Sequence, residues 1–259
     1  MNITSEELIA FIASYLWPFI RIAALVSIIP ILSAQIVPKR VKVGIALVLT
    51  VVIAPTLGAM PSIDLFSARG FLMCVYQMLI GLAMGFTIRI VFSAFETGGH
   101  VIGQTMGLGY AQMLDPSNGV TVPVISQLYT IIGTLVFLAL NGHLIVIDVL
   151  AESFKTMPVA LNTISTNGLW SIMDLSSWIF KGAVLISLPA VIALLLVNIA
   201  FGVMMRAAPQ LNIFAIGFPL SLTLGFVFIL VTLPMFLPQF THIMDSAFHT
   251  INKMVNIGG

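Results

Sequence analysis

Residues 98–123 read GGHVIGQTMGLGYAQMLDPSNGVTVP, a run that is rich in glycine yet largely apolar. The run continues an apolar helix that we expect over residues 71–95. Glycines recur at a four-residue spacing along the helix and the run, at Gly81 and Gly85 and again at Gly99, Gly103 and Gly107. Residues four apart share one face of a helix. Two stretches of that face are therefore bare, which lets another backbone approach closely, as helices do inside membranes.

The helical pattern ends after Gly109, where the chain becomes a short and partly polar loop. Tyr110 and Met113 lead into Asp115-Pro116-Ser117-Asn118-Gly119, a strong turn signature. Non-helical backbone at membrane depth persists only where it is buried in protein or lines a wet cavity. We therefore interpret this loop as the functional centre of the chain. Met106 and Met113 flank it with flexible side chains that fill irregular gaps.

The composition indicates a membrane protein. The chain has 259 residues, of which 59% are hydrophobic and 7% charged, whereas soluble domains carry about 25% charged residues. A net charge of +1 gives no basic surface for nucleic acid. Cys74 is the single cysteine, so no internal disulfide is expected. The acidic N-terminus lacks a cleavage site, so we expect no removable signal peptide.

We expect an all-α membrane protein of about six kinked apolar segments, each long enough to cross a hydrocarbon core that takes roughly 20 residues. The segments run approximately over residues 8–32, 43–60, 71–95, 120–149, 178–205 and 213–239. The basic cluster Lys39–Lys42 is predicted to be cytoplasmic by the positive-inside rule. Residues 155–174 are polar and are predicted to form a surface loop.

Prolines fall inside most of these segments, at Pro18, Pro55, Pro189, Pro219 and Pro234. Each removes a backbone donor and is expected to kink or break its helix. Repeated kinks suggest bent hairpins that wrap against partner subunits, which can satisfy the freed carbonyl groups. We find no internal repeat, which counts against an inverted-repeat transporter.

Three charged residues within or near the apolar segments are candidates for an intramembrane ion pair. Arg21 lies inside the first segment, where a charge is costly and normally faces protein or water. Its expected partner is Glu96 or another acid. Arg89 and Glu96 are seven residues apart and so share a helix face. We favour a structural ion pair or subunit contact over a transport role for these residues.

The sequence gives no sign of an enzyme. It contains no metalloprotease, phosphate-loop, serine-hydrolase or dinucleotide-binding motif. The four histidines are dispersed and show no metal-ligand spacing, so we expect no metal and no cofactor. An autonomous small-molecule transporter is an alternative, although it should place several polar residues in paired segments, and this chain offers Arg21 and little else.

Three stretches resemble one known family. They are residues 98–129, residues 141–154 (NGHLIVIDVLAESF) and residues 194–220 (LLLVNIAFGVMMRAAPQLNIFAIGFPL). Together with the length and the six-segment layout, they resemble the FliR/SctT family of type III secretion export-gate proteins. The specific features are the Asp115-Pro116 turn and the connection formed by Arg206, Pro209 and Asn212.

The resemblance implies a non-enzymatic subunit of the flagellar export gate in the bacterial inner membrane and flagellar basal body. Its implied partners are FliP, FliQ and FlhB, membrane lipid, and the unfolded flagellar substrates that pass through. Residues 1–175 would be FliP-like and residues 176–259 a FliQ-like hairpin, within a helical complex lifted partly out of the bilayer. Residues 103–123 would plug the pore, with the sealing residues Met106, Tyr110, Met113, Asp115 and Pro116.

Overall fold

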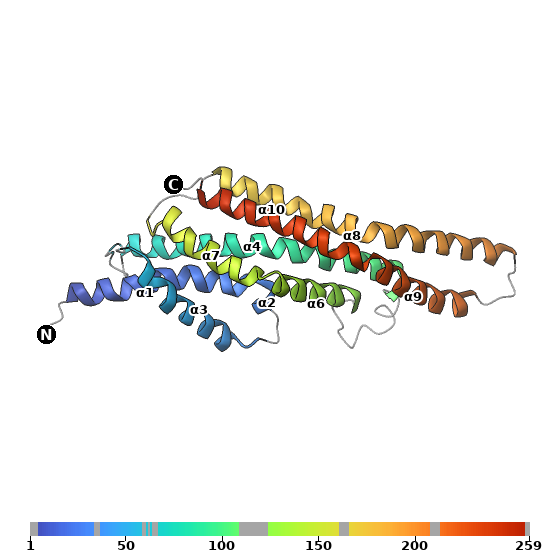
Figure 1. Cartoon of the computed structure of the whole chain (residues 1–259), viewed down its shortest axis with the longest axis horizontal. Helices are drawn as coiled ribbons and strands as arrows, with labels where there is room; N and C mark the ends of the chain where they lie inside the picture. Colours follow the sequence, from blue (N-terminus) through green and yellow to red (C-terminus); the bar gives the residue numbers. More distant parts are fainter. Residues whose placement is uncertain are drawn as a thin grey trace. The chain divides into compact units, whose positions relative to one another are not determined.

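The computed structural model describes residues 5–33, 37–58, 61, 63, 67–108, 124–160, 166–207 and 213–256, and every regular element in these ranges is helical (Figure 1). The predicted all-α fold is thus confirmed for this part of the chain. The α-helices are α1 (Ser5–Ile28), α2 (Pro30–Ser33), α3 (Lys39–Ile53), α4 (Ala68–Thr105), α6 (Val124–Ala139), α7 (Gly142–Thr156), α8 (Thr166–Ala207), α9 (Ile213–Thr232) and α10 (Phe236–Asn256). Two 3₁₀ turns, η1 (Ala54–Thr56) and η3 (Leu233–Met235), interrupt the apolar segments.

The described residues contain fewer membrane spans than the six predicted. Four stretches are long and apolar enough to cross a membrane, namely Phe11–Ile28, Ala68–Thr105, Trp170–Ala207 and Gly217–Val255. A fifth arises if the bent pair α6 and α7 counts as one span. The predicted second segment falls short because α3 has 15 residues. At 1.5 Å per residue it is about 22 Å long, less than the roughly 30 Å of a hydrocarbon core.

Each proline was expected to kink or break its helix, and the prolines fall into two groups. Pro55 and Pro234 lie in the 3₁₀ turns that end α3 and α9. In contrast, α1, α8 and α9 continue through Pro18, Pro189 and Pro219. Each of these three removes one main-chain hydrogen bond without ending the helix.

The fourth predicted segment divides at Asn141, whose φ of 55° is left-handed. Asparagine tolerates this conformation better than most side chains. Its backbone N–H donates to the carbonyl oxygen of Leu138 at 3.0 Å, which closes the end of α6 before α7 begins. The polar stretch at 155–174 is likewise not a continuous loop, because α7 runs to Thr156 and α8 begins at Thr166.

The contacts divide the chain into two units. The first unit comprises residues 1–90, 137–176 and 245–259. In it α3 crosses α1 (Figure 1), and buried Ala46, Thr50 and Ile53 mark the packed side of α3. The core of this unit includes Trp17 and Ile22 of α1, both fully buried.

The second unit comprises residues 91–136 and 177–244 and has an aromatic core. The ring centroids of Phe95 and Phe236 are 4.4 Å apart, and Phe92 meets Phe240 edge to face at 5.8 Å. Gly133 of α6 lies beside this cluster, where an added Cβ would be 3.4 Å from the ring of Phe240. The missing side chain leaves room for the rings, which pack favourably in tilted and edge-to-face pairs.

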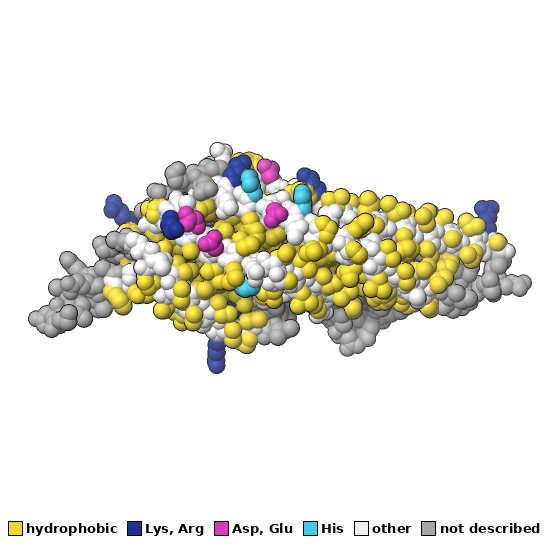
Figure 2. All heavy atoms as spheres, viewed as in Figure 1, with side chains coloured by type: hydrophobic (Ala, Val, Ile, Leu, Met, Phe, Trp, Pro, Cys, Tyr) yellow, Lys and Arg dark blue, Asp and Glu magenta, His cyan; other side chains and the backbone are white. Residues whose placement is uncertain are grey.

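Two helices are far longer than a bilayer requires. α4 has 38 residues and α8 has 42, or about 57 Å and 63 Å at 1.5 Å per residue. Large apolar side chains are exposed along nearly all of α8, from Trp170 to Met205. Figure 2 shows that hydrophobic side chains cover most of the visible surface.

Candidate functional site on the glycine-rich helix

The first glycine pair of α4 lies against α1, within the first unit. A Cβ on Gly81 would collide with the carbonyl oxygen of Arg21 and would lie 2.9 Å from the Cβ of Ala24. A Cβ on Gly85 would lie 3.1 Å from the carbonyl oxygen of Leu25. The two helices therefore meet backbone to backbone, which requires residues without side chains at the contact.

The second glycine pair lies against the start of α6, within the second unit. A Cβ on Gly99 would be 3.0 Å from both the carbonyl oxygen of Ile125 and the Cα of Ser126. At Gly103 the nearest atom is the Cβ of Ile125 at 3.5 Å, an ordinary contact distance. The chain that leaves the end of α4 thus returns to the flank of the same helix.

The end of α4 is shaped by Gly107 and Met106. Gly107 has a φ of 89°, a left-handed conformation that commonly ends helices at glycine. Its N–H donates to the carbonyl oxygen of Gln104 at 3.0 Å. Met106 is fully buried and occupies the space that Gly225 of α9 leaves, since a Cβ there would be 2.5 Å from the methionine Cγ.

Several sites predicted from the sequence lie outside the described residues. Among the sealing residues these are Tyr110, Met113, Asp115 and Pro116. In the predicted hairpin turn, Pro209 and Asn212 also lie outside, whereas Arg206 is described and exposed near the end of α8.

Among the described residues, Arg21 is the charged residue that is fully buried (0% exposed). Its guanidinium donates hydrogen bonds to neutral groups. Its Nε donates to Oε1 of Gln77 at 2.8 Å. One terminal nitrogen donates to the carbonyl oxygen and hydroxyl of Ser153, at 2.9 and 3.1 Å. The other donates to the carbonyl oxygen of Met157 at 2.9 Å, and the guanidinium carbon lies 4.2 Å from the centre of the Phe154 ring.

These contacts correct the ion pair suggested for Arg21. Arg89 and Glu96 are exposed while Arg21 is buried, and within the described ranges the ion pair is Lys155 with Glu152 at 2.8 Å. Neutral acceptors suffice because all three nitrogens of the guanidinium find partners. The sequence offered a way to find Gln77 as a partner, since it lies four residues before Gly81 and therefore on the same face of the helix.

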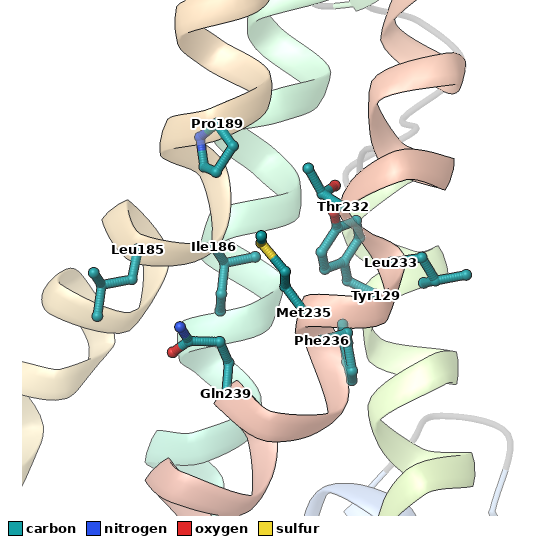
Figure 3. A pocket seen from close by; sticks show the side chains of 9 residues that line it. All are labelled: Tyr129, Leu185, Ile186, Pro189, Thr232, Leu233, Met235, Phe236 and Gln239. Atoms are coloured by element: carbon teal, nitrogen blue, oxygen red, sulfur yellow. The ribbon is translucent and has the colours of Figure 1, made fainter.

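A small cavity of about 40 Å³ lies in the second unit (Figure 3). Its polar lining consists of Tyr129, Thr232 and Gln239, with Pro189 and η3 completing the wall. The hydroxyl of Thr232 donates to the carbonyl oxygens of Phe228 at 2.8 Å and Ile229 at 3.2 Å. A volume of this size holds about one water molecule, and no catalytic group lines it. Nor do the described residues contain a group of three or more potential metal ligands.

Comparison with known proteins gives matches over nearly the whole chain. The profile of the family described as bacterial export proteins, family 1, matches residues 12–247. The flagellar biosynthetic protein FliR of Escherichia coli K12 is 37% identical over 256 residues, covering 99% of this chain and 98% of that protein. FliR of Pectobacterium carotovorum is 33% identical, covering 96% and 95%, and FliR of Bacillus subtilis is 27% identical, covering 98% and 99%.

The matched region contains the glycine-rich helix, the loop after it and the long apolar helices. The long apolar helices fit the inner membrane and the flagellar basal body. Because full-length relatives and the family profile agree, this chain belongs to the FliR family of bacterial flagellar export proteins, which is not enzymatic.

Proposed function

We propose that this chain is a subunit of the flagellar type III export gate, where it forms the export channel with FliP and FliQ and contacts FlhB. In this proposal the segment at residues 103–123, which begins in the last turn of α4, helps to seal the channel at rest. It moves aside when an unfolded flagellar substrate passes. The driving energy comes from partners, since the sequence has no nucleotide-binding motif.

The observation that supports the sealing proposal is the close contact between α4 and α6, the helices on either side of this segment. Gly99 meets the backbone of Ile125 and Ser126, and Gly107 turns the chain out of α4. We infer a functional role for the segment between these helices, since chain segments whose two ends lie close together are frequently functional. Such a segment can be displaced without disturbing the helices that carry it.

The assembly part of the proposal is supported by the exposed apolar surface. α8 presents Phe180, Leu196 and Val203 with 64–73% of their surface exposed. Apolar surface on this scale marks contact with protein or lipid. We propose that residues 1–175 take a FliP-like place and residues 176–259 a FliQ-like place in the complex, with the turn at Arg206, Pro209 and Asn212 joining the second hairpin.

Nothing in the described residues favours a small-molecule transporter instead. Buried ionisable groups mark solute and proton pathways in transporters. Arg21 is held by Gln77, Ser153 and Met157, and no acid in the described residues pairs with it. These hydrogen bonds join α1 to α4 and α7, which is a structural role.

Deletion of residues 110–119 tests the sealing function. In cells that express the complete gate, we expect the deletion to admit small ions, which a membrane-potential dye reports as depolarisation. The intact gate should stay tight. Tyr110→Ala with Met113→Ala should leak less than the deletion, because the backbone of the loop remains.

Co-purification of the deleted chain with FliP and FliQ serves as the control for assembly. A deleted chain that assembles and leaves ion permeability unchanged would rule out the seal. Depolarisation in cells whose variant fails to assemble would not count as support.

A further inference from the structure

One side of α3 is packed and the other is bare. The packed side is formed by Ala46, Thr50 and Ile53. The bare side carries large apolar side chains that are 47–64% exposed, at Val41, Val43, Leu47, Val48, Val51 and Val52. Figure 2 shows hydrophobic side chains over the region where Figure 1 places α3. Such a face needs a cover of protein or lipid.

The length of α3 matches half of a bilayer. The segment after its last basic residue, Val43–Ile53, spans about 16 Å at 1.5 Å per residue. One leaflet of a hydrocarbon core roughly 30 Å thick is about 15 Å deep. The proline in η1 then ends the helix. α3 is therefore long enough to enter one leaflet and too short to cross both.

The charge at the other end of α3 has no ion-pair partner among the residues that the structure describes. Lys39, Arg40 and Lys42 fall within its first four residues, and the sequence has no Asp or Glu between Glu7 and Asp64. Within the described ranges none of the three basic residues forms an ion pair. Basic clusters beside an apolar membrane segment bind anionic headgroups.

We propose that α3 inserts into a single leaflet of the membrane and binds anionic lipid. Lys39, Arg40 and Lys42 contact lipid phosphates at the surface, and Val43–Ile53 lies in the hydrocarbon. Lipid is the occupant favoured over a protein partner because the apolar length equals one leaflet and the cations sit at the end where headgroups begin.

Spin-label depth measurements test this proposal on the full chain assembled with its export-apparatus partners. In a Cys74→Ala background, single labels are placed at Val41→Cys, Val48→Cys and Val52→Cys. The complex is reconstituted in phosphatidylcholine vesicles with or without one-third phosphatidylglycerol. With phosphatidylglycerol we expect the labels at 48 and 52 to be accessible to oxygen, shielded from a water-soluble nickel reagent, and deeper than the label at 41.

The triple variant K39Q/R40Q/K42Q tests the headgroup contact. Each basic residue near an anionic surface contributes about fivefold, so affinity for phosphatidylglycerol in mixed micelles should fall on the order of a hundredfold. The labels should also become shallower. The conservative variant K39R/K42R should behave as the parent, and K155Q/K181Q/K253Q, which removes the same charge from exposed sites elsewhere, should leave binding unchanged.

Three results would overturn the proposal. Labels shielded from both reagents would mean that a protein partner covers α3, and labels reached by nickel would mean that water does. Equal phosphatidylglycerol binding by the parent and the K39Q/R40Q/K42Q variant would mean that the three basic residues do not bind the lipid headgroups. None of these results bears on the seal, because α3 and the loop at 103–123 are tested separately.

Discussion

Arg21 is buried inside the protein, and within the described part of the chain its partners are neutral groups and no carboxylate. Two of its acceptors, the carbonyl oxygens of Ser153 and Met157, lie at the C-terminal end of α7. The Ser153 carbonyl also accepts the N–H of Met157 at 3.0 Å, and the carbonyl groups at the C-terminus of a helix carry partial negative charge. The ring face of Phe154 adds a further attraction for the cation. The guanidinium thus caps α7 from α1 while it also binds α4 through Gln77.

Arg21→Lys should therefore weaken the fold even though the charge is kept. A single ammonium cannot reach acceptors on Gln77, Ser153 and Met157 at once. Leaving buried acceptors unpaired should cost roughly 2–4 kcal/mol of unfolding free energy, at about 1–3 kcal/mol for each group. Denaturant titration of the purified complex measures this loss.

Arg89→Lys is the matched control, since Arg89 is exposed on α4 and should change stability by about 0.5 kcal/mol or less. If both variants unfold at the same denaturant concentration, the hydrogen bonds of Arg21 do not support the fold.

The environment of Arg21 could be predicted from the sequence only in part. A charge within an apolar segment must face protein or water, and burial agrees with that expectation. Its partners could not be identified, because Ser153 and Met157 contribute main-chain carbonyl groups from more than 130 positions away. Every residue offers such a carbonyl, so no sequence pattern marks the ones that are used.

At the scale of the element, the glycines of α4 differ in how closely they are approached. An added Cβ at Gly81 or Gly99 would meet backbone atoms, whereas at Gly103 it would make an ordinary contact. Backbone cannot yield as the tip of a flexible side chain can. The spacing predicts which residues share a face, but the distances decide which of them tolerate a side chain.

We predict that Gly81→Ala and Gly99→Ala each destabilise the complex by about 1–3 kcal/mol, because the helices must separate. Gly103→Ala should be tolerated, while Gly103→Val should block assembly through its extra methyl groups. Gly44→Ala is the control, with nothing within 4 Å of the added atom, and should be neutral or gain up to about 1 kcal/mol of helix propensity.

Co-purification yield and melting temperature of the complex measure this series. Equal behaviour of Gly99→Ala and Gly44→Ala would mean that the contact between α4 and α6 is not close in the assembled gate.

The boundaries of the helices were harder to predict from the sequence than their positions. Apolar runs located the helices well, yet residues 120–149 read as one segment because long apolar runs lie on both sides of Asn141-Gly142-His143. The Asn-Gly pair is a turn signal, but the hydropathy of the segment outweighed it. Conversely, α8 begins within a polar stretch that hydropathy assigns to a loop.

At the scale of the whole chain, exposed apolar surface dominates. Large hydrophobic side chains are exposed on α3, α4, α8 and α9. Produced alone, the chain should aggregate in mild detergent. Produced with the neighbouring export-apparatus subunits, it should elute as one discrete species. Size-exclusion chromatography distinguishes the two outcomes. A monodisperse chain that binds a small solute by itself would instead support a transporter.

The 42 residues of α8 have a consequence for how the cell keeps subunits in balance. A bilayer can solvate about 30 Å of a helix that is about 63 Å long. A newly made copy without neighbouring subunits therefore exposes the apolar side chains on the rest of this helix to water. Quality-control proteases degrade such orphans, and the steady-state amount of this subunit would then follow the supply of its neighbours. A pulse-chase comparison of its half-life, with and without neighbouring genes, would reveal that dependence as faster turnover of the orphan.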